Sequence, residues 1–157
     1  DSCMDHDALL RELKEQEERL QFTVFTNEMA VEIGMYLYQK AREEKLPVTI
    51  DVTRSGQQLF HAALPGTSPD NDQWIIRKCR VVNRFYQSSY RVGIQLKNEG
   101  RSLEEKFNIS TLDFAPHGGC FPIILRGTGV IGTITVSGLE QSADHAMVVE
   151  AVEKFIK

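Results

Sequence analysis

The stretch DFAPHGGCFPIILRGTGVIGTITVSG, residues 113–138, decides the fold. It places two apolar segments, Gly119–Leu125 and Val130–Ser137, on either side of a glycine-containing turn. In the second segment aliphatic and threonine side chains alternate, which is the two-residue period of a β-strand. We therefore predict a β-hairpin here, and we consider a further short strand at Asp113–Ala115.

The turn of this hairpin matches the pattern G-x-G-x-x-G over Gly127–Gly132. In a dinucleotide site this pattern must leave a strand and open a helix, so that the pyrophosphate meets the helix N-terminus. Here the strand sequence TITVSG follows instead. Gly127 and Gly129 are therefore interpreted as turn residues that need a positive φ, and not as part of a nucleotide site.

The rest of the chain predicts a second hairpin and several helices. Residues 47–64 alternate in the same way around the turn Ser55–Gly56. Helices are expected at 7–20, from the Thr26 cap to about 45, from a capping box at Asp70 to about 86, at 89–97, from Ser102 to about 109, and after a cap at Ser142. This order predicts one layered α/β (α+β) domain with a mainly antiparallel sheet flanked by helices.

Two surfaces of the predicted domain need a covering partner. The helix after Thr26 carries apolar residues nearly all round, so either the first helix or another subunit must cover its extra face. The strands at 48–53 and 130–137 each have a threonine-rich face, which could meet solvent, a ligand pocket or a subunit. The apolar helix favours a subunit interface.

The composition limits the class of function. The chain has 157 residues, 41% hydrophobic and 25% charged, with a net charge of -4, as expected for one globular domain without general attraction to nucleic acid or anionic membranes. No apolar run approaches the roughly 20 residues of a membrane span, and three cysteines make no disulfide framework. We expect a cytoplasmic protein in which Asp1–Cys3 are vector-derived residues ahead of Met4.

Two short elements and one helix face could bind a ligand. His117, Gly118, Gly119 and Cys120 combine an imidazole with two glycines that let the backbone approach a ligand closely. The alternative is a plain turn into a strand, with His117 hydrogen-bonded and Cys120 buried.

Asp144 and His145 lie in the first turn of the last helix, where His145 could be a ligand or proton carrier, or the pair could simply start the helix. Arg77 and Lys78 belong to a basic stretch with Arg80 and Arg84 that could bind anions or lie in solvent. No metal-ligand pattern occurs in the sequence.

The combination of motifs resembles the haem-degrading domain family, which includes GlcG-like and HbpS-like proteins. The resemblance rests on the segments 117–122, 132–139 and 144–145, and it is closest to a branch that also shows the patterns at 70–78, 85–89 and 105–107. It spans residues 22–157, preceded by an N-terminal helix at 4–21. The resemblance implies about five antiparallel strands flanked by helices, self-association into dimers or larger assemblies, and haem as a cofactor of some members.

These observations leave two main hypotheses for the function, and a third, an enzyme acting on an unknown small molecule, rests only on the two histidine-containing elements. The first is a homo-oligomer that binds a small ligand or a tetrapyrrole, with His117 or His145 as axial ligand and the basic helix facing the propionates. The second is a non-enzymatic assembly module in which the same motifs are structural. Whether His117, His145 and the basic helix surround one pocket distinguishes the hypotheses.

Overall fold

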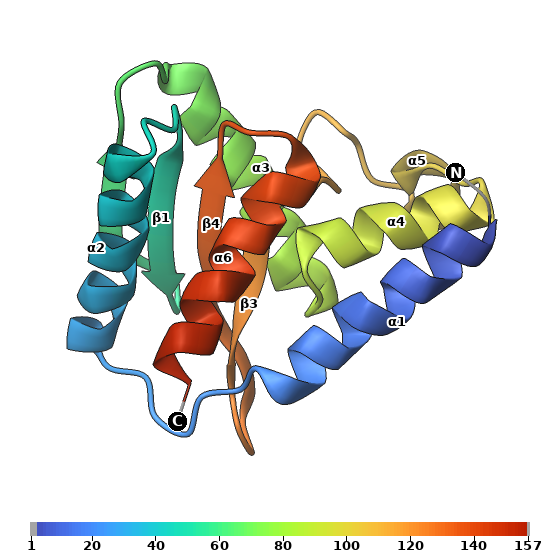
Figure 1. Cartoon of the computed structure of the whole chain (residues 1–157). Coiled ribbons are helices and arrows are strands. Elements are labelled where there is room, and N and C mark those ends of the chain that lie inside the picture. Colours follow the sequence, from blue (N-terminus) through green and yellow to red (C-terminus); the bar gives the residue numbers. More distant parts are fainter. Residues whose placement is uncertain (1–2, 157) are drawn as a thin grey trace.

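The computed structural model describes residues 3–156 as six helices and one four-stranded antiparallel sheet with the strand order β2-β1-β4-β3 (Figure 1). The elements are α1 Cys3–Arg19, α2 Asn27–Glu43, β1 Thr49–Arg54, β2 Gln57–Ala63, α3 Pro69–Phe85, α4 Ser89–Glu99, α5 Leu103–Phe107, β3 Cys120–Leu125, β4 Gly129–Ser137 and α6 Gln141–Phe155. Both predicted hairpins are present, and β1 pairs with β4 to join them at the centre of the sheet. Residues 1–2 of the expected vector-derived segment lie outside the described residues.

The predicted α+β architecture is confirmed, with four strands where the resemblance implied about five. The segment Asp113–Ala115 forms no strand among the described residues because its backbone bonds go elsewhere. The amides of Asp113 and Phe114 donate to the carbonyl of Ser110 in a turn, and the amide of Ala115 donates to the carbonyl of Arg77 on α3.

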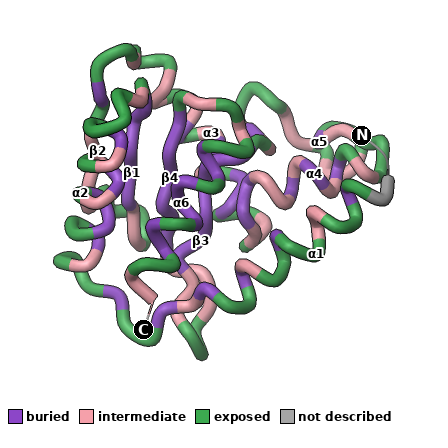
Figure 2. The backbone as a smooth tube through the Cα atoms, in the orientation of Figure 1, coloured by how far each residue is buried: buried purple, intermediate pink, exposed green. Residues whose placement is uncertain are grey.

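The sheet is covered on both faces. Helices α2 and α6 pack on one face, where the aliphatic side chains of the strands form the main core, and α3 packs on the other (Figure 1). Burial along β1 and β4 is nearly continuous, as Figure 2 shows. The main core contains Ile33, Leu37, Ile50, Val52, Phe121, Ile134, Val136, Val148 and Val152, among others.

The threonine-rich face lies under α3, and not in solvent or at a subunit interface as considered from the sequence. Thr133 and Thr135 are fully buried, and both hydroxyls contact the Sγ of Cys79 on α3. The preference for a subunit interface at this face is therefore wrong. The amphipathic pattern of α3 supplies the cover from within the chain.

The extra face of α2 is not covered by the first helix. Helix α1 packs instead on α4, where the buried carboxylate of Glu17 accepts hydrogen bonds from the amide of Ser88 and from Arg91. Val31 and Met35 on α2, one helical turn apart, stay 44% and 40% exposed.

Two helix starts differ from the sequence prediction. Ser68, and not Asp70, caps α3, in a capping box with Asn71. Helix α6 begins after Glu140 without a side-chain cap, so the expected Ser142 cap is wrong. The prediction for the glycine turn is confirmed, since Gly127 and Gly129 both have a positive φ. Within residues 3–156, none of the helices combines the length and the apolar character needed to cross a bilayer.

Candidate functional site

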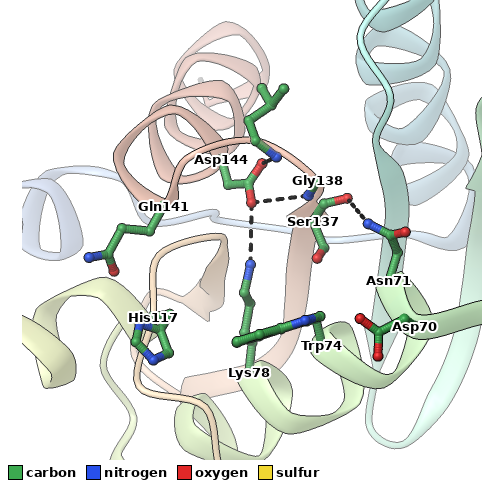
Figure 3. Close-up of a pocket in the computed structure, with 10 residues that line it drawn as sticks. Asp70, Asn71, Trp74, Lys78, His117, Ser137, Gly138, Gln141 and Asp144 are labelled. Atoms are coloured by element: carbon green, nitrogen blue, oxygen red, sulfur yellow. Dashed lines mark hydrogen bonds and ion pairs between the residues drawn. The ribbon is translucent and has the colours of Figure 1, made fainter. Parts of the chain in front are cut away.

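A cavity of about 380 Å3 lies where α3, the turn before β3, the end of β4 and the start of α6 meet (Figure 3). Three segments that are distant in sequence contribute to it, residues 70–78, His117 and residues 137–144, which is typical of a site built by the tertiary fold. Its lining residues are Asp70, Asn71, Trp74, Lys78, His117, Ser137, Gly138, Leu139, Gln141 and Asp144.

At its inner end, the cavity contains a buried ion pair. The Nζ of Lys78 lies 3.3 Å from the Oδ2 of Asp144, and the two side chains are only 4% and 2% exposed. Asp144 also accepts hydrogen bonds from the amides of Gly138 and Leu139, at 3.2 and 2.9 Å. These bonds join the end of β4 to the first turns of α6 and orient the carboxylate toward Lys78 (Figure 3).

Burial shifts the pKa of both partners toward the neutral forms. It lowers the pKa of Lys78 and raises the pKa of Asp144, while the attraction between the two charges opposes both shifts. A lysine in such an environment can act as a base or a nucleophile, because burial favours its neutral amine.

The two glycines of the turn allow the close approach that builds this site. A Cβ on Gly119 would collide with the carbonyl oxygen of Val136 and with the Nζ of Lys78, and its φ of +135° is unfavourable for other residues. A Cβ on Gly118 would collide with the backbone of Gln141. The amide of Gly118 donates to the Oε1 of Gln141 at 3.0 Å, which holds the turn against α6.

His117 and Trp74 form one wall of the cavity. Their rings meet edge to face with centroids 5.7 Å apart. Burial, followed by the positive charges of Lys78 and Arg77, lowers the pKa of His117, so the imidazole is neutral at pH 7. A neutral imidazole can both donate and accept a hydrogen bond, depending on its tautomer.

The side chains of the predicted basic stretch on α3 point in different directions. Arg77 lies over the Trp74 ring at 4.4 Å, whereas Lys78 points into the protein toward Asp144. Arg80 lies at the surface, where its guanidinium donates to the carbonyl oxygen of Asp113. Arg77 and Lys78 therefore lie in different surroundings, although they are adjacent on α3.

His145 and Cys120 lie outside the cavity. The Nε2 of His145 contacts the Oε1 of Gln16 on α1 at 2.8 Å, and its ring packs against Tyr90 and Phe121. Burial lowers the pKa of His145 to about 4. Cys120 is buried at the start of β3, with its thiol against Cys79. His117 and His145 thus have separate surroundings, and in residues 3–156 no three acidic, histidine or cysteine side chains converge as metal ligands.

The comparison with known families agrees with these elements. A profile described as the HbpS-like haem-degrading proteins matches residues 25–153, which include every residue of the cavity. The chain belongs to this HbpS-like family. Family membership confirms the resemblance drawn from the motifs at 117–122, 132–139 and 144–145.

Related proteins confirm the fold over nearly the whole chain. A UPF0303 protein of Streptomyces coelicolor is 53% identical over 145 residues, which cover 92% of each chain. The crystal structure of the Ybr137w protein is 34% identical with a TM-score of 0.85, covering 93% of this chain and 87% of that one. A structure of a PduOC–heme complex shares the fold at 13% identity, with a TM-score of 0.69 and coverage of 83% and 94%.

Sequence reasoning did not single out several lining residues as site residues. Trp74 and Gln141 are the most prominent of them. A signal for Trp74 was available, because it is the only tryptophan and lies four residues before Lys78, on the same face of a predicted helix. Gln141 had no such signal, since its contact with Gly118 depends on how α6 meets the turn.

Proposed function

We propose that this HbpS-like protein binds a small, neutral, hydroxyl- or carbonyl-bearing molecule in the cavity at Lys78 and His117. The observation that carries the proposal is the buried Lys78–Asp144 pair at the inner end of a cavity with a polar lining. Removing an ion pair from water costs free energy. Ionisable groups with shifted pKa values that line a cavity are therefore candidates for a functional site, where such a cost serves binding or chemistry.

The charge of the lining favours a neutral ligand. Lys78 and Asp144 compensate each other, His117 is neutral, and Asp70 adds a negative charge. The remaining groups are amides, a hydroxyl and an indole, which suit hydroxyl and carbonyl groups above one apolar face.

An apolar extension of the ligand has room next to this cavity. A second cavity of about 260 Å3 shares His117 and Gln141 with the first. Its surface is mainly apolar, through groups such as Leu96, Leu103 and Pro116, and Lys97 and Arg101 also contribute to its lining. A ligand with a polar head and a short apolar arm would occupy both. The His117 ring would then lie between the two parts.

The lining does not fit a haem within one subunit. A haem needs broad apolar walls and cations for its propionates, whereas Lys78, the cation in the lining of this cavity, is paired with Asp144, and Asp70 is a second acidic group. His145 is enclosed by α1 and α4 residues, away from the cavity. We therefore assign no role through haem to these residues.

The fluorescence of Trp74 tests the proposal, because it is the only tryptophan of the chain and lines the cavity. A panel of polyols, sugars and small neutral ketones is titrated against the protein and against His117→Ala, with short hydroxy acids as an anionic comparison and hemin as a separate arm. We expect saturable quenching by a neutral member that weakens at least tenfold in His117→Ala. Saturable hemin binding that shifts the Soret band and is lost in His117→Ala would overturn the assignment to a small ligand.

We also propose that the chain self-associates through α2. Val31 and Met35 form an apolar pair that stays 44% and 40% exposed, and a second copy could bury the rest of both side chains. Light scattering over a dilution series is expected to give an oligomer that dissociates in the double variant Val31→Glu/Met35→Glu. The same substitution to glutamate at Ile76 and Leu112, two exposed apolar residues outside α2, serves as the control. A monomer at micromolar concentration would refute this proposal.

A further inference from the structure

Two thiols lie close together at residues that directly follow Lys78 and Gly119 in the sequence. Cys79 is on α3, and Cys120 is the first residue of β3, with their Sγ atoms 3.7 Å apart and neither in a disulfide. A disulfide has an S–S length of about 2.05 Å, so bond formation needs the sulfurs to move together by roughly 1.7 Å. Side-chain rotation and a small shift of α3 over the sheet can supply such a movement.

The two thiols have different surroundings. The Sγ of Cys79 contacts the hydroxyls of Thr135 and Thr133 at 3.3 and 3.5 Å, and Cys79 is partly exposed, whereas Cys120 is fully buried. The hydrogen bond from Cys120 lowers the pKa of Cys79, as do the hydrogen bonds between its thiol and the threonine hydroxyls, while burial opposes this shift. Burial raises the pKa of Cys120 well above its usual value. Cys79 is thus the better nucleophile, and Cys120 is a protonated thiol beside it.

We propose that Cys79 and Cys120 form a modification site that a hydroperoxide oxidises to an intrachain disulfide. The Cys79 thiolate attacks the peroxide oxygen, the O–O bond breaks, and Cys79 becomes a sulfenic acid while the alkoxide or hydroxide leaves and takes a proton. Cys120 then attacks the Cys79 sulfur, and its proton leaves with the sulfenic hydroxyl as water. The two thiols lose two electrons in total, and the peroxide accepts both.

The disulfide would change the walls of the cavity. Its two residues adjoin Lys78 and Gly119 in sequence, and the Nζ of Lys78 packs directly on Gly119. Linking residues 79 and 120 would therefore fix the two segments that enclose the Lys78 amine. This consequence rests on the proposed function of the cavity, whereas the disulfide itself does not.

The test uses the full chain with Cys3→Ser, which leaves Cys79 and Cys120 as the two thiols. The folded protein is treated with a slight excess of hydrogen peroxide and measured by mass spectrometry without reduction. We expect the loss of two hydrogens, a peptide that links residues 79 and 120, and complete reversal by dithiothreitol. In the Cys120→Ser variant, dimedone is expected to label Cys79, because the sulfenic acid has no thiol to attack it.

A second variant keeps both thiols and tests the surroundings. Thr135→Val removes a hydroxyl that contacts Cys79, and we expect several-fold slower disulfide formation at the same circular dichroism spectrum. Two intact thiols after peroxide, a link between two chains, or dimedone labelling of Cys79 while Cys120 is present would each overturn the proposal.

The ligand site is measured separately. Trp74 fluorescence titrations with a ligand identified above are compared between reduced and oxidised protein. Disulfide formation with unchanged affinity would overturn only the effect on the cavity. If the titrations show no ligand at all, the proposed function fails, while the mass spectra still decide the disulfide.

Discussion

Replacing Lys78 by methionine tests the central feature of the site. The substitution keeps a long apolar side chain on α3 but removes the ammonium group that lies 3.3 Å from Asp144. The carboxylate then stays in a site where its side chain is 2% exposed, with only the two backbone amides of Gly138 and Leu139 as donors. Removing one partner of a buried ion pair typically lowers the free energy of unfolding by about 3–5 kcal/mol, and we expect a decrease in this range for Lys78→Met at pH 7.

The loss is measured by urea unfolding, followed by circular dichroism and by the fluorescence of Trp74. Arg80→Met is the matched control, because Arg80 is on the same helix but is 49% exposed and 3.9 Å from Asp113. Exposed pairs contribute about 0–1 kcal/mol, so the control should lie in that range. A double variant, Lys78→Met with Asp144→Asn, should cost at least about 1 kcal/mol less than the sum of the single variants.

The pH dependence gives an independent check. Burial already raises the pKa of Asp144, and removing Lys78 removes the charge that opposes this shift. In the folded variant Asp144 therefore takes up a proton at a higher pH than in the unfolded chain. The loss of unfolding free energy is complete above this raised pKa, where the buried carboxylate is charged. It shrinks as the pH falls toward 3.8, because the carboxylate becomes neutral. A loss below about 1 kcal/mol, equal to that of Arg80→Met, or a loss independent of pH, would refute the reasoning.

Three further outcomes are expected. His145 has a pKa of about 4 in the folded protein, against 6.5 for a free histidine. The neutral imidazole therefore favours folding fully above pH 6.5, and the free energy of unfolding should fall by about 3 kcal/mol as the pH drops to 4. Urea unfolding of His145→Phe should show a pH dependence that is smaller by this amount. Gly119→Ala should lower the stability by about 2–3 kcal/mol through its collisions, while Gly127→Ala, where a Cβ meets nothing, should cost about 1 kcal/mol in thermal unfolding. Glu17→Ala should expose α1 to proteolysis, because the carboxylate joins it to α4, and an unchanged cleavage rate would contradict this.

Local signals in the sequence determined most of the secondary structure. Alternating side chains gave both hairpins, Gly127 and Gly129 gave the turn, and the Thr26 and Ser102 caps gave two helix starts. These features depend on a few neighbouring residues, so a single sequence is sufficient to predict them. The same locality explains the errors at Asp70 and Ser142, since several polar residues near a helix start can each act as its cap.

Only the tertiary structure decided what lies around each chemical group. The sequence showed His117, Lys78 and Asp144 as separate motifs, and it grouped Lys78 with the arginines and His145 with Asp144. Packing of α3 on the sheet turned Lys78 inward to meet a carboxylate 66 residues away, and the docking of α1 and α4 enclosed His145. Such contacts depend on where whole elements pack, because adjacent side chains on a helix point about 100° apart and the packing of the helix decides which of them faces the interior. The sequence therefore determined the elements and the family, while the fold decided which side chains share a site.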